Sequence, residues 1–193
     1  MPDEVTFRTV VLGGGRSSRM GFDKLTAPFA GEPLLRRLVL ALEPLVPLVV
    51  TTAAGAAVLE GLPFATVVVT EPTAGPAASL ALADAAVPPE VPLAVLPGDL
   101  PFLDAARVEA FVRGVPPETD VAWPVVGGTP GHPVVWSPRA RGLLTTLMPD
   151  EPPSRLRRDA RLVVAPIQAD DDAYVTDVDT PDAWEAALAR VRP

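Results

Sequence analysis

The sequence predicts a three-layer α/β/α sandwich built on a mostly parallel, Rossmann-like sheet. Short apolar runs alternate along the chain with amphipathic helical stretches. Most of these runs show no polar alternation, which is typical of strands covered on both faces. Strands that alternate with helices in this way form parallel sheets with helices on both sides. The length of 193 residues suits one domain, so we expect a single domain over residues 1–193.

The expected elements follow from local patterns. The candidate strands are residues 7–12, 45–51, 65–70, 92–96, 120–124, 133–136 and 162–165. Pro33 can open a helix whose leucines and Val39 share one face. Residues 77–86 and 104–113 show similar helical patterns, and Asp104 is placed to cap the second of them. Thr180 and Pro181 begin a final helix with Trp184 on its apolar stripe.

Composition excludes several classes of protein. A hydrophobic content of 48% and a mean hydropathy of +0.28 exclude disorder. A net charge of −8 argues against nucleic-acid binding, which requires a basic face. The chain has no cysteine and one histidine, which excludes disulfides, thiol catalysis and clusters of histidine around a metal. No signal peptide or membrane span is visible, so we expect a cytoplasmic protein that is a monomer or a weak homo-oligomer.

A glycine-rich loop over residues 11–24 carries the clearest functional signal. An apolar run ends in three glycines, and Arg16, Arg19 and Lys24 follow. Glycines expose backbone N–H groups and let the chain approach a ligand, while the three cations compensate several negative charges. This combination favours a polyphosphate site, although the spacing matches neither the Walker loop nor the dinucleotide fingerprint. The alternative is a glycine-rich turn with solvated arginines.

Acidic side chains supply a second and a third functional segment. Asp99 directly follows the strand over residues 92–96, at the sheet edge where open α/β sheets bind ligands. Asp177 and Asp179 are two residues apart in extended chain, so their side chains point to the same side. These three carboxylates are candidate ligands for Mg²⁺, with Mn²⁺ as an alternative. Asp99 could otherwise bond its own turn, and residues 170–172 are interpreted as a solvated acidic turn.

Six segments, in order, resemble one enzyme family. They are residues 12–24, Gly31-Glu32-Pro33-Leu34, Gly75-Pro76, Asp99-Leu100-Pro101-Phe102, His132-Pro133 and Asp177-Val178-Asp179-Thr180-Pro181. They are similar to motifs of the molybdenum cofactor guanylyltransferase family, the molybdopterin nucleotidyltransferases, and cover essentially the whole chain. The resemblance implies a fold of the nucleotide-diphospho-sugar transferase type. It also implies transfer of GMP from GTP to the terminal phosphate of molybdopterin, with release of pyrophosphate.

The resemblance also implies roles for individual residues. The implied catalytic residues are Lys24, Arg19 and Asp99, and the implied metal ligands are Asp99, Asp177 and Asp179. The implied nucleotide-binding residues are Leu12, Gly13, Gly14, Gly15, Lys24, Thr51, Glu71 and Asp99. A phosphate monoester is already anionic at neutral pH, so this transfer needs no protein nucleophile or strong base.

Some features leave the substrate open. Thr51 stands where guanylyltransferases usually have Asn, and the Asp-x-Asp-Thr-Pro ending is more typical of cytidylyltransferases. A CTP-dependent molybdopterin cytidylyltransferase, an enzyme acting on another phosphorylated small molecule, and a non-catalytic nucleotide-binding accessory protein therefore remain alternatives. His132 is interpreted as a structural or substrate-edge hydrogen-bonding residue rather than a base. The arginines of residues 155–161 form either a solvated face or a site for an anionic substrate.

Overall fold

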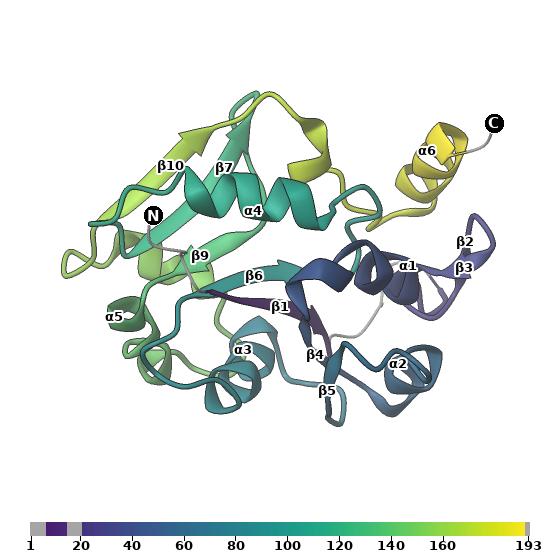
Figure 1. Ribbon diagram of the computed structural model, residues 1–193, viewed down its shortest axis with the longest axis horizontal. Helices are drawn as coiled ribbons and strands as arrows, with labels where there is room; N and C mark the ends of the chain where they lie inside the picture. Colours follow the sequence, from purple (N-terminus) through teal and green to yellow (C-terminus); the bar gives the residue numbers. More distant parts are fainter. Residues whose placement is uncertain (1–6, 15–20, 192–193) are drawn as a thin grey trace.

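An eight-stranded sheet forms the centre of the molecule in the computed structural model, which describes residues 7–14 and 21–191 (Figure 1). Its strands run in the order β10-β7-β9-β6-β1-β4-β5, and the short strand β8 pairs with β7. Only β8 and β9 run antiparallel to their neighbours among these strands, so the sheet is mostly parallel as predicted. The strands are β1 Arg8–Gly13, β4 Leu48–Thr51, β5 Thr66–Val69, β6 Leu93–Pro97, β7 Val121–Val126, β8 Thr129–Pro130, β9 Val134–Trp136 and β10 Val164–Gln168.

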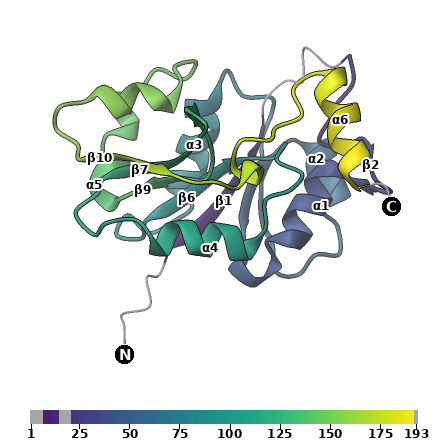
Figure 2. The same cartoon turned by 90° about the horizontal axis from the view of Figure 1, so that it is seen from above.

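Helices cover both faces of this sheet, which confirms the three-layer architecture. Figure 2 shows α4 on one side and α3 on the other. The first face carries α1 Leu34–Ala41, α2 Ala53–Val58 and α4 Ala105–Arg113. The second carries α3 Pro76–Ala85, α5 Pro138–Arg141 and the 3₁₀ turns η2 Leu144–Thr146 and η3 Pro153–Arg158.

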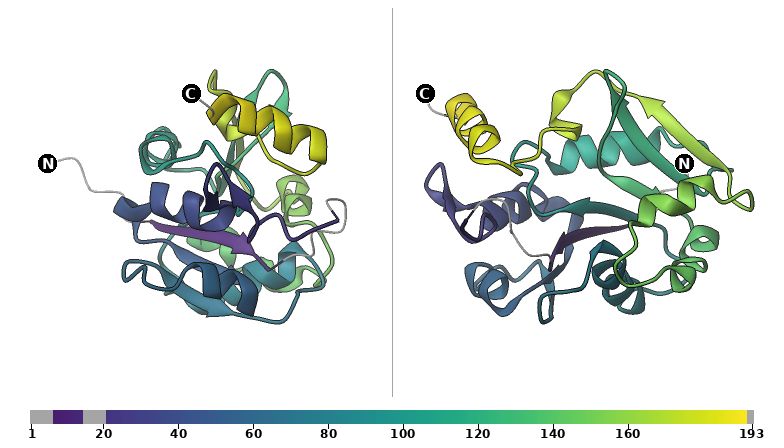
Figure 3. Two further views of the ribbon diagram at one scale, coloured as in Figure 1. Left: turned by 90° about the vertical axis from the view of Figure 1, so that its right-hand side faces the viewer. Right: turned by 180° about the vertical axis from the view of Figure 1, so that it is seen from behind.

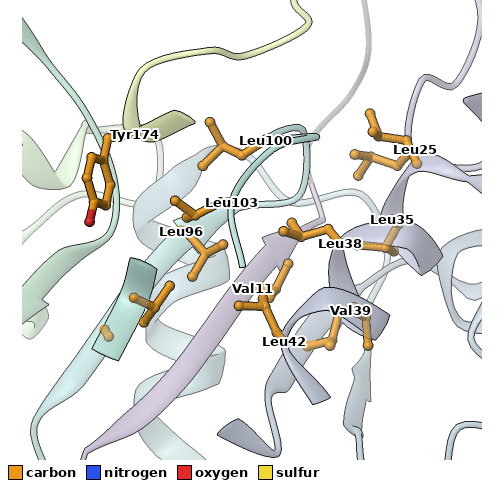
Figure 4. Packing of buried hydrophobic residues seen from close by; sticks show 14 of the residues in the cluster. Val11, Leu25, Leu35, Leu38, Val39, Leu42, Leu96, Leu100, Leu103 and Tyr174 are labelled. Atoms are coloured by element: carbon orange, nitrogen blue, oxygen red, sulfur yellow. The ribbon is translucent and has the colours of Figure 1, made fainter. Parts of the chain in front are cut away.

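The core of the first face is built from the two central strands and α1. Val11 of β1 and Leu96 of β6 pack with Leu35 and Leu38 of α1, and all four are buried (Figure 4). Because successive side chains of a strand point to opposite faces, Val10 and Val95 belong instead to the core under α3. Each central strand is therefore apolar on both faces, which explains its unbroken hydrophobic run.

The last helix, α6 Pro181–Val191, packs against a small hairpin rather than against the sheet. The hairpin consists of β2 Pro28–Phe29 and β3 Glu32–Pro33, and α6 lies beside it (Figure 3). Trp184 meets Phe29 edge to face, with ring centroids 5.1 Å apart. This contact brings the C-terminal helix to the segment that follows the glycine-rich loop.

Some local structure differs from the sequence-based expectation. The strand expected over residues 45–51 begins only at Leu48, because Glu43–Leu45 form a 3₁₀ turn, η1, and Val46 adopts a left-handed conformation (φ 46°). The hairpin and α2 were not predicted, since α2 is mostly alanine and glycine and has no apolar period. No helix in the described residues is both long and apolar enough to cross a membrane.

Candidate functional site

A cleft of about 1030 Å³ opens at the carboxyl edge of the central strands. β1 and β6 are parallel neighbours, so the chain leaves both of them at the same edge. Gly98 N–H donates to the Leu12 carbonyl at 2.9 Å, which holds the two exits together. Gly13 and Gly14 therefore line the same cleft as Asp99, which the sequence had placed at this edge of the sheet.

Lys24 lies between two carboxylates in this cleft. Its Nζ donates to Asp99 Oδ2 at 2.6 Å and also to Asp179 Oδ1. Burial of the ammonium disfavours its charge, but the attraction of Asp99 and the hydrogen bonds to both carboxylates prevail and raise the pKa of Lys24. The side chain is only 10% exposed, so it is a fixed, permanently charged group at the centre of the site.

The glycine turn is held by hydrogen bonds to its carbonyls and lines the cleft. The Thr51 hydroxyl is buried and donates to the Gly13 carbonyl at 3.2 Å. Thr73 N–H donates to the Gly14 carbonyl at 3.0 Å, and a Cβ at Gly14 would lie 3.1 Å from Ser79 Oγ. These contacts fix the backbone of the turn, while the absence of side chains leaves it open to a ligand. The proposed contact of Thr51 with a nucleotide stays a prediction.

The expected cluster of three carboxylates is not formed. No three His, Cys, Asp or Glu side chains within residues 7–14 and 21–191 gather as a metal site. Asp99 and Asp179 converge on Lys24, and Val178 N–H donates to the Asp99 carbonyl at 3.2 Å, which aligns the two segments. The predicted role of Asp177 as a metal ligand stays a prediction.

One oxygen of Asp99 nevertheless fits a divalent cation. Asp99 Oδ1 is buried and accepts no hydrogen bond from the described residues, while Oδ2 binds Lys24. An unsatisfied buried carboxylate oxygen is costly unless a ligand completes it. Asp99, with Asp179 beside it, is therefore the best candidate to hold Mg²⁺ or Mn²⁺.

A second cavity of about 510 Å³ adjoins the cleft and shares Gly13, Leu25 and Pro72 with it. Thr51 and Glu71, both predicted to bind nucleotide, line this second cavity rather than the cleft. The predicted site residues therefore fall into two connected chambers, the larger cleft and this smaller cavity.

Three polar side chains lie along the far part of the cleft. Burial lowers the pKa of His132, so the imidazole is neutral at pH 7. Its Nδ1, Trp136 Nε1 and Arg157 Nε have no hydrogen-bond partner among the described residues. The Arg157 guanidinium lies 4.2 Å from the centre of the Trp123 ring.

The arginines of residues 155–161 divide in role. Arg157 lines the cleft, whereas Arg155 pairs with Glu151 and Arg161 pairs with Asp159 on the surface. Two predicted site residues, Gly15 and Arg19, lie outside the described residues, as does Arg16. The sequence analysis missed Phe22, Thr73 and Ser79, all of which line one of the two chambers.

A recognisable signal existed for only some of the missed residues. Phe22 is the one aromatic residue in the glycine-rich loop. Thr73 lies just before the Gly75-Pro76 helix start, but its contact with Gly14 spans 59 positions and depends on strand order.

Comparisons with known proteins agree with this geometry. Residues 9–167 match the family model described as the MobA-like NTP transferase domain. A molybdenum cofactor guanylyltransferase of Xanthomonas euvesicatoria pv. vesicatoria is 38% identical over 99 residues, so the match spans only about half of each chain, 50% of this one and 49% of that enzyme.

Solved structures match over nearly the whole chain. The homologue of Mycobacterium tuberculosis Rv0371c from Mycobacterium sp. strain JC1 is 29% identical with a TM-score of 0.79, and the match covers 96% of both chains. Rv0371c from M. tuberculosis H37Rv is 27% identical with a TM-score of 0.80, covering 95% of this chain and 99% of that one. These matches confirm the predicted type of fold.

Proposed function

Because this chain belongs to the MobA-like NTP transferase family, we propose that it transfers a nucleotidyl group from a nucleoside triphosphate to a phosphorylated acceptor. The acceptor we propose is the terminal phosphate of molybdopterin, and the donor is GTP. Pyrophosphate is the second product. The named Xanthomonas relative supports this choice of substrates.

The observation that carries the proposal is the contact between Lys24 and Asp99. Lys24 Nζ lies 2.6 Å from Asp99 Oδ2, although the two residues are 75 positions apart. Had these side chains lain at opposite ends of the molecule, no single triphosphate could have reached both. Their meeting opposite the glycine turn makes one compact anion site with a cation, a glycine backbone that lines the cleft and a carboxylate oxygen that accepts no hydrogen bond from the described residues.

The chain's own residues account for most of the proposed chemistry. The Gly13–Gly14 backbone binds phosphate oxygens, and Lys24 offsets charge as the acceptor phosphate approaches and as pyrophosphate leaves. A divalent cation held by Asp99 and Asp179 would supply further charge compensation. No side chain has to act as nucleophile or base, because the acceptor phosphate is already anionic, and this agrees with the neutral, buried His132.

The second cavity supports GTP as donor. Glu71 lines it, and a carboxylate can accept hydrogen bonds from both N1–H and the N2 amino group of guanine. Cytosine offers one amino group and two acceptors on the same edge, so a carboxylate there satisfies less of it. We therefore expect Glu71→Gln to narrow the preference for GTP over CTP.

The experiment is pyrophosphate release from GTP, CTP, ATP and UTP, each with molybdopterin and Mg²⁺. We expect release with GTP, and a loss of about 10²–10³-fold in rate in Asp99→Asn, by analogy with removal of one charge-stabilising contact. Asp170→Asn is the matched control, since Asp170 is exposed and lines neither chamber.

Other outcomes would decide between the alternatives. Release with CTP alone would identify a cytidylyltransferase. Nucleotide binding without release for any triphosphate would identify an accessory protein. Wild-type activity in Asp99→Asn would contradict the assigned role of Asp99.

A further inference from the structure

An exposed aromatic ring borders the smaller chamber. Phe22 is 44% exposed and lines the cavity of about 510 Å³ together with Thr51 and Glu71. Most large apolar side chains in the described residues are buried, so this ring is a candidate for contact with a ligand.

The ring is held in place from two directions. Trp184 of α6 meets Phe22 edge to face, with centroids 5.5 Å apart and planes at 85°, and the same indole meets Phe29. Edge-to-face packing of this kind is a preferred aromatic geometry. On the chain itself, the turn after Phe22 is fixed because Leu25 N–H donates to Asp23 Oδ1 at 3.1 Å and Ala27 N–H donates to the Asp23 carbonyl at 3.0 Å.

The two chambers differ in chemistry, and each suits a different part of a nucleotide. The cleft holds the cation, the carboxylates and the glycine turn, so it suits the charged phosphates. The smaller chamber, reached past Gly13, has an aromatic ring, threonine side chains and two carboxylates, Asp23 and Glu71. That mixture of an apolar face with a few polar groups is typical of sites for a planar heterocycle.

We propose that Phe22 contacts the nucleobase of the bound nucleotide and that Trp184 is a positioning residue that holds the Phe22 ring at the chamber. This inference rests on the proposed nucleotide site. It adds that an aromatic side chain, Phe22, recognises the base. An aromatic ring can contact any nucleobase because every base has a π-face, so this contact supplies affinity for the nucleotide. Selectivity between bases comes from polar groups such as Glu71.

The test separates the base from the phosphates. Calorimetry measures Kd for Mg–GTP and for Mg–pyrophosphate in the full chain, in Phe22→Ala and in Phe22→Tyr. Phe22→Ala should weaken the binding of Mg–GTP roughly 5- to 150-fold, the range for loss of one base–aromatic stack, and should leave the affinity for Mg–pyrophosphate unchanged. Phe22→Tyr retains the ring and should bind GTP as the unmodified protein does. Met148→Ala is the matched control, since Met148 is also exposed but lines neither chamber.

The role of Trp184 is tested by a double-mutant cycle with Phe22. If Trp184 acts through Phe22, Trp184→Ala weakens the binding of Mg–GTP when Phe22 is present. The same change has no further effect on GTP affinity in Phe22→Ala. Trp184 is buried, so its removal could disturb folding. Trp184→Phe keeps an aromatic ring in contact with Phe29, is therefore the variant expected to fold, and should retain part of the GTP affinity.

Three results would overturn the inference. They are an unchanged GTP affinity in Phe22→Ala, equal weakening of GTP and pyrophosphate, and additive effects of Phe22 and Trp184. A failure of the unmodified protein to bind GTP at all would instead contradict the proposed function on which the inference rests.

Discussion

Lys24 is the residue on which the site depends. It lies at the end of the glycine-rich loop, yet its partners come from the middle and the end of the chain. Its ammonium is already paired with two carboxylates, so it cannot by itself offset the charge of a triphosphate. A cation bound at the unsatisfied Asp99 Oδ1 would supply the further positive charge.

His132, the only histidine of the chain, gives a test at the residue scale. Burial lowers its pKa below the ordinary value of 6.5. The unfolded chain therefore takes up a proton near pH 6.5 that the folded chain does not, so this group removes stability as the pH falls below 6.5 and contributes none above it. A single imidazole signal in an NMR pH titration should report a midpoint below 6.5.

Denaturation supplies the matching control for His132. The unfolding free energies of wild type and His132→Gln are compared at pH 7.5 and at pH 5.5, and we expect their difference to change between the two pH values. The other titrating groups are common to both proteins, so their contributions cancel in this difference. An NMR midpoint at or above 6.5 would contradict the account of this histidine.

At the scale of elements, Arg141 joins α5 to the connection between α3 and β6. Its guanidinium is buried and binds Asp84 together with the carbonyls of Val87, Pro88 and Val91. Arg141→Met leaves these acceptors unpaired and should lower the unfolding free energy by about 3–5 kcal/mol, measured by urea denaturation. Arg113→Met, on the exposed face of α4, should change it by less than about 0.5 kcal/mol. Similar values for both variants would show that the buried network is not stabilising.

The elements also show what local sequence can predict. All strands of the central sheet except β8, and the helices α1, α3, α4 and α6, have patterns of their own, so they were predicted to within a few residues. α2 and the β2–β3 hairpin form because of neighbours that lie elsewhere, such as Trp184 against Phe29. Such elements have no local period to detect.

For the whole molecule, the sequence placed Asp99 at the carboxyl edge of the sheet, and the strand order seen in the structure then brought the glycine turn beside it. Because β1 and β6 are parallel neighbours, Gly13 and Asp99 had to meet at one edge. The details did not follow, since they depend on long-range packing. Lys24 pairs with both Asp99 and Asp179, and Arg157 reaches the cleft from a 3₁₀ turn that no pattern predicted.

The central claim is that one metal–triphosphate is bound between the glycine turn and Asp99. The most direct measurement is anomalous diffraction from crystals grown with Mn²⁺ and a non-hydrolysable GTP analogue. The account predicts a manganese peak bound to Asp99, with the triphosphate on the backbone of Gly13 and Gly14 and the base in the chamber of Glu71. A nucleotide bound elsewhere, or manganese that does not touch Asp99, would contradict it.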